Sequence, residues 1–276
     1  MILPFVYRFA LILCIMSTGA AFAASSKVEC PTSDDNAGIT VPLPEVARAL
    51  QPGRTLNVLA IGSATMFGPE ASLAPGTITS QSLGDGAPAT VAETRIFSKE
   101  ASERAFPRQM VQNLKALVPG ADVQITVRGG RGLLATDMLA LMRTELASRT
   151  FQLVIWQTGT VEAVRNLPPG EFGQTLSDGV EIAQAAHADM VLIDPQYSRF
   201  LQTNSNLDPY IQALQQVASL PGVVLFRRFD LMRNWANDGH IDLERTSRVD
   251  RQRVIEALHA CLGRHLARLV LDTARM

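Results

Sequence analysis

LNVLAIG, residues 56–62, is a nearly continuous apolar run that ends in glycine. A run of this length and composition is typical of a strand that is buried on both faces of a parallel sheet. Four similar runs follow, each closed by Gly, Pro or polar residues. They are residues 123–127, 153–156, 190–193 and 223–226. The sequence therefore predicts five buried strands.

Amphipathic stretches with helical spacing separate these runs. They are residues 103–117, 133–146, 172–186, 207–219 and 250–271, and a shorter helix is expected at 45–50. Strands that alternate with helices predict an α/β fold. We expect a three-layer α/β/α sandwich around a mostly parallel five-stranded sheet with right-handed crossovers. In such sheets ligands bind beyond the carboxyl ends of the strands, so the residues that follow each strand are the candidate site.

The N-terminus predicts export. Residues 1–23 combine Arg8, an apolar run and a small-residue ending, Ala-Phe-Ala, which is the pattern of a cleaved signal peptide. We interpret residues 24–54 as an arm, 55–276 as one domain, and 69–99, rich in Gly, Pro, Ser and Thr, as a flexible insertion. The insertion could cover the site or be a surface loop without a role. An uncleaved membrane anchor at residues 1–23 is the alternative to a signal peptide.

The composition of the chain limits the classes of molecule that it is expected to bind. The net charge is −1 and no basic run is present, which argues against nucleic acid and a polybasic membrane patch. After signal cleavage we expect no integral membrane segment and a periplasmic or secreted location. Cys30 and Cys261 would then remain, and an oxidising compartment would let them pair as a disulfide. The other interpretation is a buried Cys261 with Cys30 left as a free thiol.

Three segments after the predicted strands carry a family resemblance. They read GSATMFG at 62–68, RGG at 128–130 and WQTGTVEA at 156–163. Their order and placement resemble the first three blocks of the SGNH/GDSL hydrolases. The resemblance implies a flavodoxin-like fold and hydrolysis of carboxylic esters, such as acylated glycans, lipids or small esters. The sequence has no phosphate-binding glycine loop with its lysine, and we propose no nucleotide or metal cofactor.

The family places its nucleophilic serine third in the first block, and here that residue is Ala64. Alanine cannot attack a carbonyl carbon. Ser63 is the nearest hydroxyl and is our candidate nucleophile, with N-capping of the following turn as its alternative role. For the oxyanion site the resemblance points to Gly129, whose backbone N–H would donate, and a tight strand-end turn is an equal explanation.

The third block of the family, G-x-N-D, contains an asparagine that donates to the oxyanion. Here the block is Gly159, Thr160, Val161 and Glu162, and valine offers no such donor. Loss of one donor costs about 100-fold to 1,000-fold in rate. Glu162 retains an acid at the position of the family aspartate, and a solvated carboxylate at a helix start explains it as well.

The base in this family comes from a late Asp-x-x-His segment. This chain has Asp238 and His240 separated by one residue, so the spacing departs from the pattern. His240 is the candidate base with Asp238 or Asp242 as its orienting acid, and a histidine before a turn without a catalytic role is the alternative.

Several altered positions together predict an exported SGNH-type protein whose ester hydrolysis is impaired and whose cleft binds a small-molecule or glycan ester. Two alternatives stay open. One is an active esterase that uses Ser63 and His240 in shifted geometry, and the other is a non-catalytic envelope assembly protein.

Overall fold

The computed structural model describes residues 30–31, 41–69 and 102–276. The predicted signal peptide and all but the first residue of the predicted 69–99 insertion lie outside the described residues.

Five strands form one sheet, as predicted. They are β1 (Thr55–Gly62), β2 (Asp122–Gly129), β3 (Leu153–Gln157), β4 (Asp189–Ile193) and β5 (Val223–Phe226). The strand order is β2-β1-β3-β4-β5, and every neighbouring pair is parallel. This order is that of the flavodoxin-like fold, in which the strand order reverses between β1 and β3. The α/β prediction is confirmed, and the sheet is wholly rather than mostly parallel.

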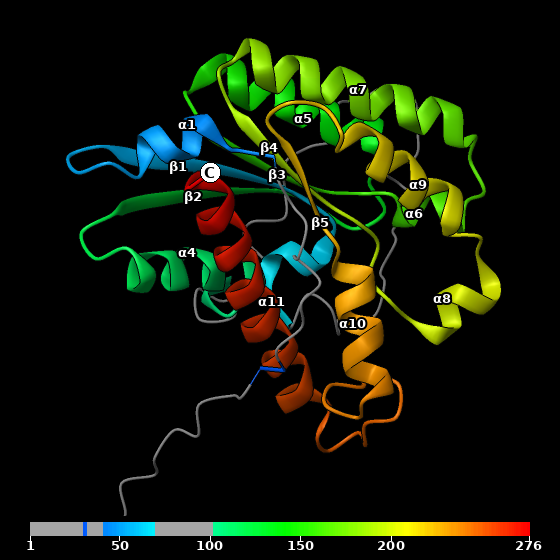
Figure 1. Ribbon diagram of the computed structural model, residues 1–276. Helices are drawn as coiled ribbons and strands as arrows, with labels where there is room; N and C mark the ends of the chain where they lie inside the picture. Colours follow the sequence, from blue (N-terminus) through cyan, green and yellow to red (C-terminus); the bar gives the residue numbers. More distant parts are fainter. Residues whose placement is uncertain (1–29, 32–40, 70–101) are drawn as a thin grey trace, which may run out of the picture.

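Helices cover both faces of the sheet, which gives the predicted three layers (Figure 1). One face packs against α1 (Pro44–Ala49), α4 (Phe106–Leu117), α10 (Arg228–Asn237) and α11 (Arg251–Ala274). The other packs against α5 (Ala135–Ser148), α7 (Pro169–Ala185) and α9 (Asp208–Val217). The short elements η1 (Ala64–Phe67), α6 (Thr160–Val164) and α8 (Arg199–Asn204) follow β1, β3 and β4, and like α10 they were not expected from the sequence.

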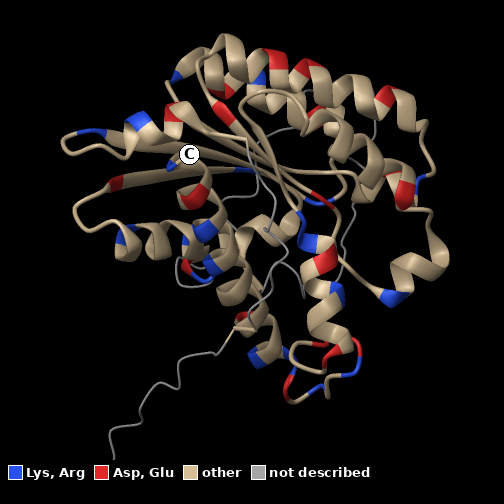
Figure 2. Ribbon diagram, viewed as in Figure 1, with Lys and Arg blue, Asp and Glu red and all other residues tan. Residues whose placement is uncertain are grey.

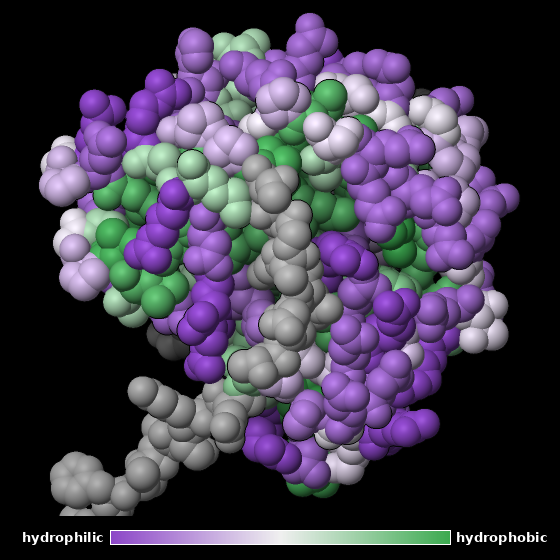
Figure 3. All heavy atoms as spheres, viewed as in Figure 1, coloured by the Kyte–Doolittle hydropathy of each residue, from purple (hydrophilic) through white to green (hydrophobic). Residues whose placement is uncertain are grey.

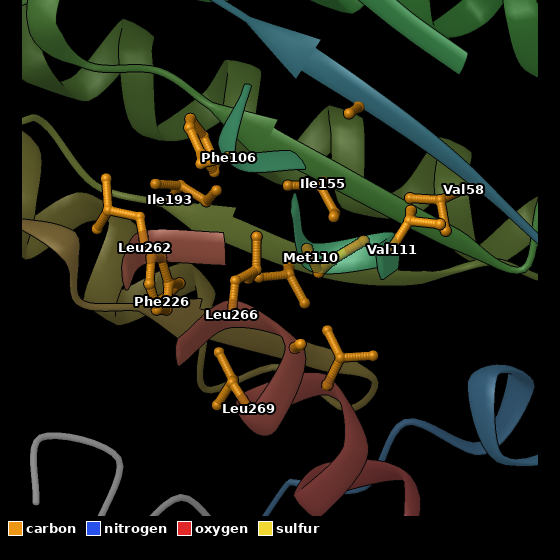
Figure 4. Packing of buried hydrophobic residues seen from close by; sticks show 14 of the residues in the cluster. Val58, Phe106, Met110, Val111, Ile155, Ile193, Phe226, Leu262, Leu266 and Leu269 are labelled. Atoms are coloured by element: carbon orange, nitrogen blue, oxygen red, sulfur yellow. The ribbon is translucent and has the colours of Figure 1, made fainter. Parts of the chain in front are cut away.

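The alternating side chains of each strand supply two cores. Val58, Ile155 and Ile193 point toward α4 and α11, and Figure 4 shows them against Phe106 and Leu266. A side chain that follows one of these in sequence faces α5, α7 and α9 instead. The strands β1, β3, β4 and β5 are therefore buried on both faces, which explains their continuous apolar sequence, whereas the edge strand β2 buries only Val123 and Val127.

Two glycines allow close packing. A Cβ at Gly179 of α7 would lie 2.3 Å from Cζ3 of Trp156, and one at Gly263 of α11 would lie 2.4 Å from Cβ of Gln109 in α4. These contacts set how closely α7 approaches β3 and how closely α11 approaches α4.

The Cys30–Cys261 disulfide is present, with the two Cα atoms 5.3 Å apart. It joins the N-terminal side of the chain to α11 and leaves neither cysteine as a free thiol. Within the described residues, no helix is both long enough and apolar enough to cross a membrane.

Candidate active site

The carboxyl ends of β1, β2 and β3 meet at the reversal of strand order. Ser63 directly follows β1, and Gly62 is the register partner of Gly129 on β2. Gln157 is the last residue of β3, on the other side of β1. The first and third sequence blocks thus lie where this fold binds its ligands.

Ser63, Thr65 and Gln157 form a closed ring of hydrogen bonds at this edge. The Gln157 amide Nε2 donates to Ser63 Oγ at 2.7 Å, and Thr65 Oγ1 donates to Gln157 Oε1 at 2.9 Å. Ser63 Oγ and Thr65 Oγ1 are 3.1 Å apart. Since the Thr65 proton is used on Gln157, the Ser63 hydroxyl is the donor in this third bond. Every member of the ring therefore both donates and accepts.

The ring is half-enclosed rather than open to solvent. Gln157 is 3% exposed, and both hydroxyls are partly buried. Ser63 precedes η1, but its side chain makes no capping hydrogen bond to that helix. The N-capping role proposed for Ser63 is therefore wrong, because its hydroxyl turns across to β3 instead.

Gly129 is required by backbone geometry. Its φ is +131°, and a Cβ there would lie 1.8 Å from the Gly62 carbonyl oxygen. The Gly130 N–H donates to that oxygen at 3.0 Å. In a parallel pair alternate N–H groups face the neighbouring strand, so the Gly129 N–H points away from β1. The strand-end turn accounts for this glycine, and its role as an oxyanion donor stays a prediction.

Glu162 links the second and third blocks. One of its carboxylate oxygens accepts from the Ala135 N–H at the start of α5, and the other accepts from the Gly159 N–H at 3.2 Å. Glu162 is 4% exposed, and this burial raises the pKa of its carboxyl group. The expectation of a solvated carboxylate is wrong. Because the Gly159 N–H is engaged by Glu162, it is not aimed at a ligand; Thr160 and Val161 open the first turn of α6.

The Asp238-Gly239-His240 segment ends α10. Gly239 has φ +74°, its N–H donates to the Ala236 carbonyl, and the His240 N–H donates to the Trp235 carbonyl at 2.9 Å. These two bonds are those of a Schellman motif, which satisfies the last carbonyls of a helix. The side chains of Asp238 and His240 are exposed and form no hydrogen bond within the described part of the chain. Neither side chain hydrogen-bonds to the Ser63 ring, and the roles of His240 as base and Asp238 as orienting acid stay predictions.

Asp242 is held by Arg199. Arg199 Nη2 lies 3.0 Å from Asp242 Oδ2, and Glu244 accepts from the Arg199 and Phe200 N–H groups at the start of α8. The hydrogen bond from Arg199 holds the pKa of the Asp242 carboxyl below its usual range despite some desolvation. This network ties the loop between α10 and α11, which carries both charge signs (Figure 2), to the segment after β4. It engages Asp242 away from His240.

None of the other three histidines hydrogen-bonds to the ring. His187 is exposed just after α7, at φ +56°. His265 Nε2 is 3.1 Å from the Pro31 carbonyl oxygen, beside the disulfide. His259 is 3% exposed and its Nδ1 accepts from the Phe106 N–H at 3.1 Å. Among the described residues no group of His, Cys, Asp or Glu could hold a metal ion.

A buried polar cluster behind β4 and β5 was not found from the sequence. Asp194 follows β4, is 1% exposed and accepts from the Phe229 N–H at 2.8 Å. Burial raises the pKa of Asp194 to about 7, while burial and the cation of Arg228 lower the pKa of His259 to about 3. Arg228 is itself 1% exposed. Adjacent arginines after an apolar run, at 227–228, were the only signal.

The fold has known counterparts. A catalytic mutant of Axe2, an acetylxylan esterase from Geobacillus stearothermophilus, matches with a TM-score of 0.56 at 16% identity, over 80% of this chain and 96% of that one. A lipase/acylhydrolase from Enterococcus faecalis matches with a TM-score of 0.51 at 14% identity, over 77% and 95%. At these identities the likeness is one of fold. No curated protein sequence matches the chain.

The strand order and these counterparts confirm the fold that the resemblance to the SGNH/GDSL hydrolases predicted. Residues 88–276, more than half of the chain, match the Non-GDSL lipase-like family. The chain belongs to that family.

Proposed function

We propose that this chain is an exported SGNH-fold protein that binds a ligand at the carboxyl edge of its sheet and hydrolyses esters poorly or not at all. The observation that carries the proposal is the closed ring of Ser63, Thr65 and Gln157. The ligand class suggested by the family is a small-molecule or glycan ester.

A serine becomes a nucleophile when a neighbouring base accepts its proton. In the ring, the group nearest to Ser63 Oγ is the Gln157 amide, whose N–H donates a hydrogen bond to that oxygen at 2.7 Å. The Ser63 proton is directed to Thr65, a neutral hydroxyl that cannot hold it. The ring therefore contains no base that can take the Ser63 proton, so Ser63 is not activated within it.

The remaining parts of the hydrolytic site support the same conclusion. His240 belongs to the Schellman motif of α10 and its imidazole is exposed, and the family serine position holds Ala64. The Gly159 N–H is engaged by Glu162, and Val161 supplies no amide donor. Each missing donor costs about 100-fold to 1,000-fold in rate, so the losses together suppress ester turnover.

The alternative, an esterase that uses Ser63 and His240 with Asp238 or Asp242, requires the ring to open and His240 to bond Ser63, with which it makes no hydrogen bond. The test is hydrolysis of a short-chain p-nitrophenyl ester by the purified protein beside Ser63→Ala and His240→Ala. We expect all three proteins to match the buffer rate. Turnover by the unaltered protein that both substitutions abolish would establish the esterase instead.

Export is supported by the predicted signal peptide and by the Cys30–Cys261 disulfide, since disulfides persist in oxidising compartments. Envelope assembly, the third function considered, requires a docking surface. An apolar groove of about 520 Å³ between α1 and the end of α11 is the nearest candidate, and nothing identifies an occupant for it.

A further inference from the structure

The outer side of β2 carries unpaired backbone groups. β2 is an edge strand of 8 residues, whereas β5, at the other edge of the sheet, has 4 (Figure 1). The Gly130 N–H donates to the Gly62 carbonyl of β1, and successive residues of a parallel strand turn their N–H and C=O groups to opposite sides. The N–H and C=O groups of Val123, Ile125 and Val127 therefore face away from β1. In the part of the chain that the structure describes, none of these three N–H groups finds an acceptor.

An unpaired edge of this kind is a template for another strand. The Val127 carbonyl accepts from Arg128 Nη1 of its own chain at 3.1 Å, and a carbonyl oxygen can accept a second hydrogen bond. Asp122 and Gln124 are exposed and Ile125 is half-buried, so the edge reaches the surface. A partner strand could therefore pair with β2 without displacing another element that is bonded to this edge.

The sequence of β2 is complementary to itself. A two-fold axis through Ile125 would set two copies of the strand antiparallel, with Ile125 opposite its counterpart and Val123 opposite Val127. These are the residues whose N–H and C=O groups face outward, so each pair can exchange both of its backbone hydrogen bonds. The same alignment sets Asp122 of each copy opposite Arg128 of the other. Opposite charges that face one another across two strands stabilise the pairing.

Neighbouring registers lack this match of charge. A shift must keep the outward-facing residues paired with one another, so the two nearest alternatives move the partner by two residues. One sets Arg128 opposite Gln124, and the other sets Asp122 opposite Thr126. Neither brings two opposite charges together, so the charges of β2 favour the alignment that is centred on Ile125.

Both charged side chains have atoms left for a partner. Arg128 donates from Nε to Glu145 at 2.6 Å and from Nη1 to the Val127 carbonyl, and no described residue accepts from its Nη2. Asp122 accepts from the Thr55 hydroxyl through Oδ2 at 2.7 Å, and no described residue donates to its Oδ1. Each ion pair between the two copies could thus form while the bonds within each copy are kept.

Apolar surface lies beside this edge. Figure 3 shows hydrophobic atoms at the left of the molecule, where α4 ends and β2 begins in Figure 1. Leu117, the last residue of α4, is 40% exposed, and Val118 after it is half-buried. Exposed apolar side chains next to an unpaired edge add to the surface that a partner would cover.

We propose that two copies of this chain associate through β2 in an antiparallel, two-fold symmetric dimer, in which one sheet runs through both copies. Such an interface is isologous and closes on itself, whereas pairing of β2 with β5 of another copy would leave open edges and build filaments. The inference goes beyond the proposed function, because the interface does not involve the Ser63 ring. Its test and the ester test can therefore fail separately.

The test is sedimentation equilibrium of the purified protein from about 1 µM to about 1 mM, a range that covers weak to moderate dissociation constants. We expect the mass to rise to twice that of the monomer and no further. Hydrogen exchange of residues 122–129 should slow over the same range, because the N–H groups of Val123, Ile125 and Val127 gain acceptors only in the dimer.

Two substitutions at the edge test the alignment. Asp122→Lys sets a cation opposite Arg128 at both ends of the interface and should weaken the dimer about tenfold to 100-fold. Ile125→Pro removes the central N–H and should abolish the dimer. Because that N–H faces away from β1, an edge strand tolerates proline there, and circular dichroism checks that the fold is kept. Glu181→Lys on α7, which reverses an exposed charge on another element, is the control and should leave the dimer unchanged.

Three results would overturn the inference. The first is a monomer over the whole range of concentration. The second is a dimer that Ile125→Pro leaves intact, or that Asp122→Lys weakens no more than Glu181→Lys does, because the contact would then lie elsewhere. The third is exchange of residues 122–129 that does not depend on concentration. Masses above that of a dimer would favour filaments and would also contradict it.

Discussion

Gly179→Ala tests whether α7 packs against β3 as closely as the structure indicates. The added Cβ would lie 2.3 Å from Cζ3 and 3.0 Å from Cη2 of Trp156. Trp156 is fully buried and its Nε1 donates to Met138 Sδ at 3.4 Å, so its ring has no free space to move into. Either the helix or the ring must shift.

The magnitude follows from two opposing effects. Overpacking of a well-filled core costs about 1–3 kcal/mol. Replacing a helical glycine by alanine returns about 1 kcal/mol through helix propensity. We therefore expect Gly179→Ala to lower the free energy of unfolding by up to about 2 kcal/mol, which lowers the Tm by up to roughly 8 °C in a chain of this size.

Gly173→Ala on the same helix is the matched control. Its Cβ would meet only the Ala213 Cβ, at 3.9 Å, which is ordinary contact. It should keep the propensity gain without the clash and raise the free energy of unfolding by about 0.5–1 kcal/mol. Urea unfolding followed by circular dichroism measures both variants. Equal stability of the two would refute the close packing of Gly179 on Trp156.

Three further predictions concern buried charge and the disulfide. Asp194 has a raised pKa, so its stabilisation is lost as pH rises from about 4 toward 7, and His259 has a lowered pKa, so its stabilisation is lost as pH falls from 6.5 toward 3. Between about pH 4 and 6.5 the free energy of unfolding should thus rise more steeply with pH in Asp194→Asn than in the unaltered protein. In His259→Gln it should fall as pH rises. Slopes equal to that of the unaltered protein would contradict the burial of these groups. Glu162→Gln should lower the unfolding free energy by about 1–3 kcal/mol, since one backbone N–H then faces an amide donor, whereas the exposed Glu171→Gln should change it by under about 0.5 kcal/mol. Cys30→Ser should cost about 2–4 kcal/mol by thermal unfolding, and a reductant should bring the unaltered protein to the same Tm while leaving the variant unchanged.

The fold could be predicted because burial on both faces makes four of the five strands nearly continuous apolar runs, as in residues 56–61 and 190–193, and only the edge strand β2 departs from this. The α10 helix was missed because its sequence interleaves charged residues with a buried face, and its two leading arginines resemble a loop. Gly239 after that helix was a C-capping signal that could have identified the Schellman motif, and with it the structural role of the segment that contains His240.

The site could be predicted only in part. Ser63 and Gln157 were both expected at strand ends, but their hydrogen bond joins residues 94 apart in sequence and depends on the register of β1 against β3. Glu162 looked solvated because a helix start is usually exposed. Its carboxylate is bonded by the Ala135 N–H at the start of α5, 27 residues earlier in the chain, which no local pattern encodes.

The measurement that tests the account most directly is labelling of the folded protein with a fluorophosphonate, followed by intact mass spectrometry. Such a reagent forms a covalent adduct with an activated serine whatever the natural substrate is. An active serine esterase in the same reaction serves as the positive control. The hydrogen-bonded ring of Ser63, Thr65 and Gln157 predicts no adduct on this chain, and a stoichiometric adduct that Ser63→Ala removes would contradict the claim that Ser63 is not activated.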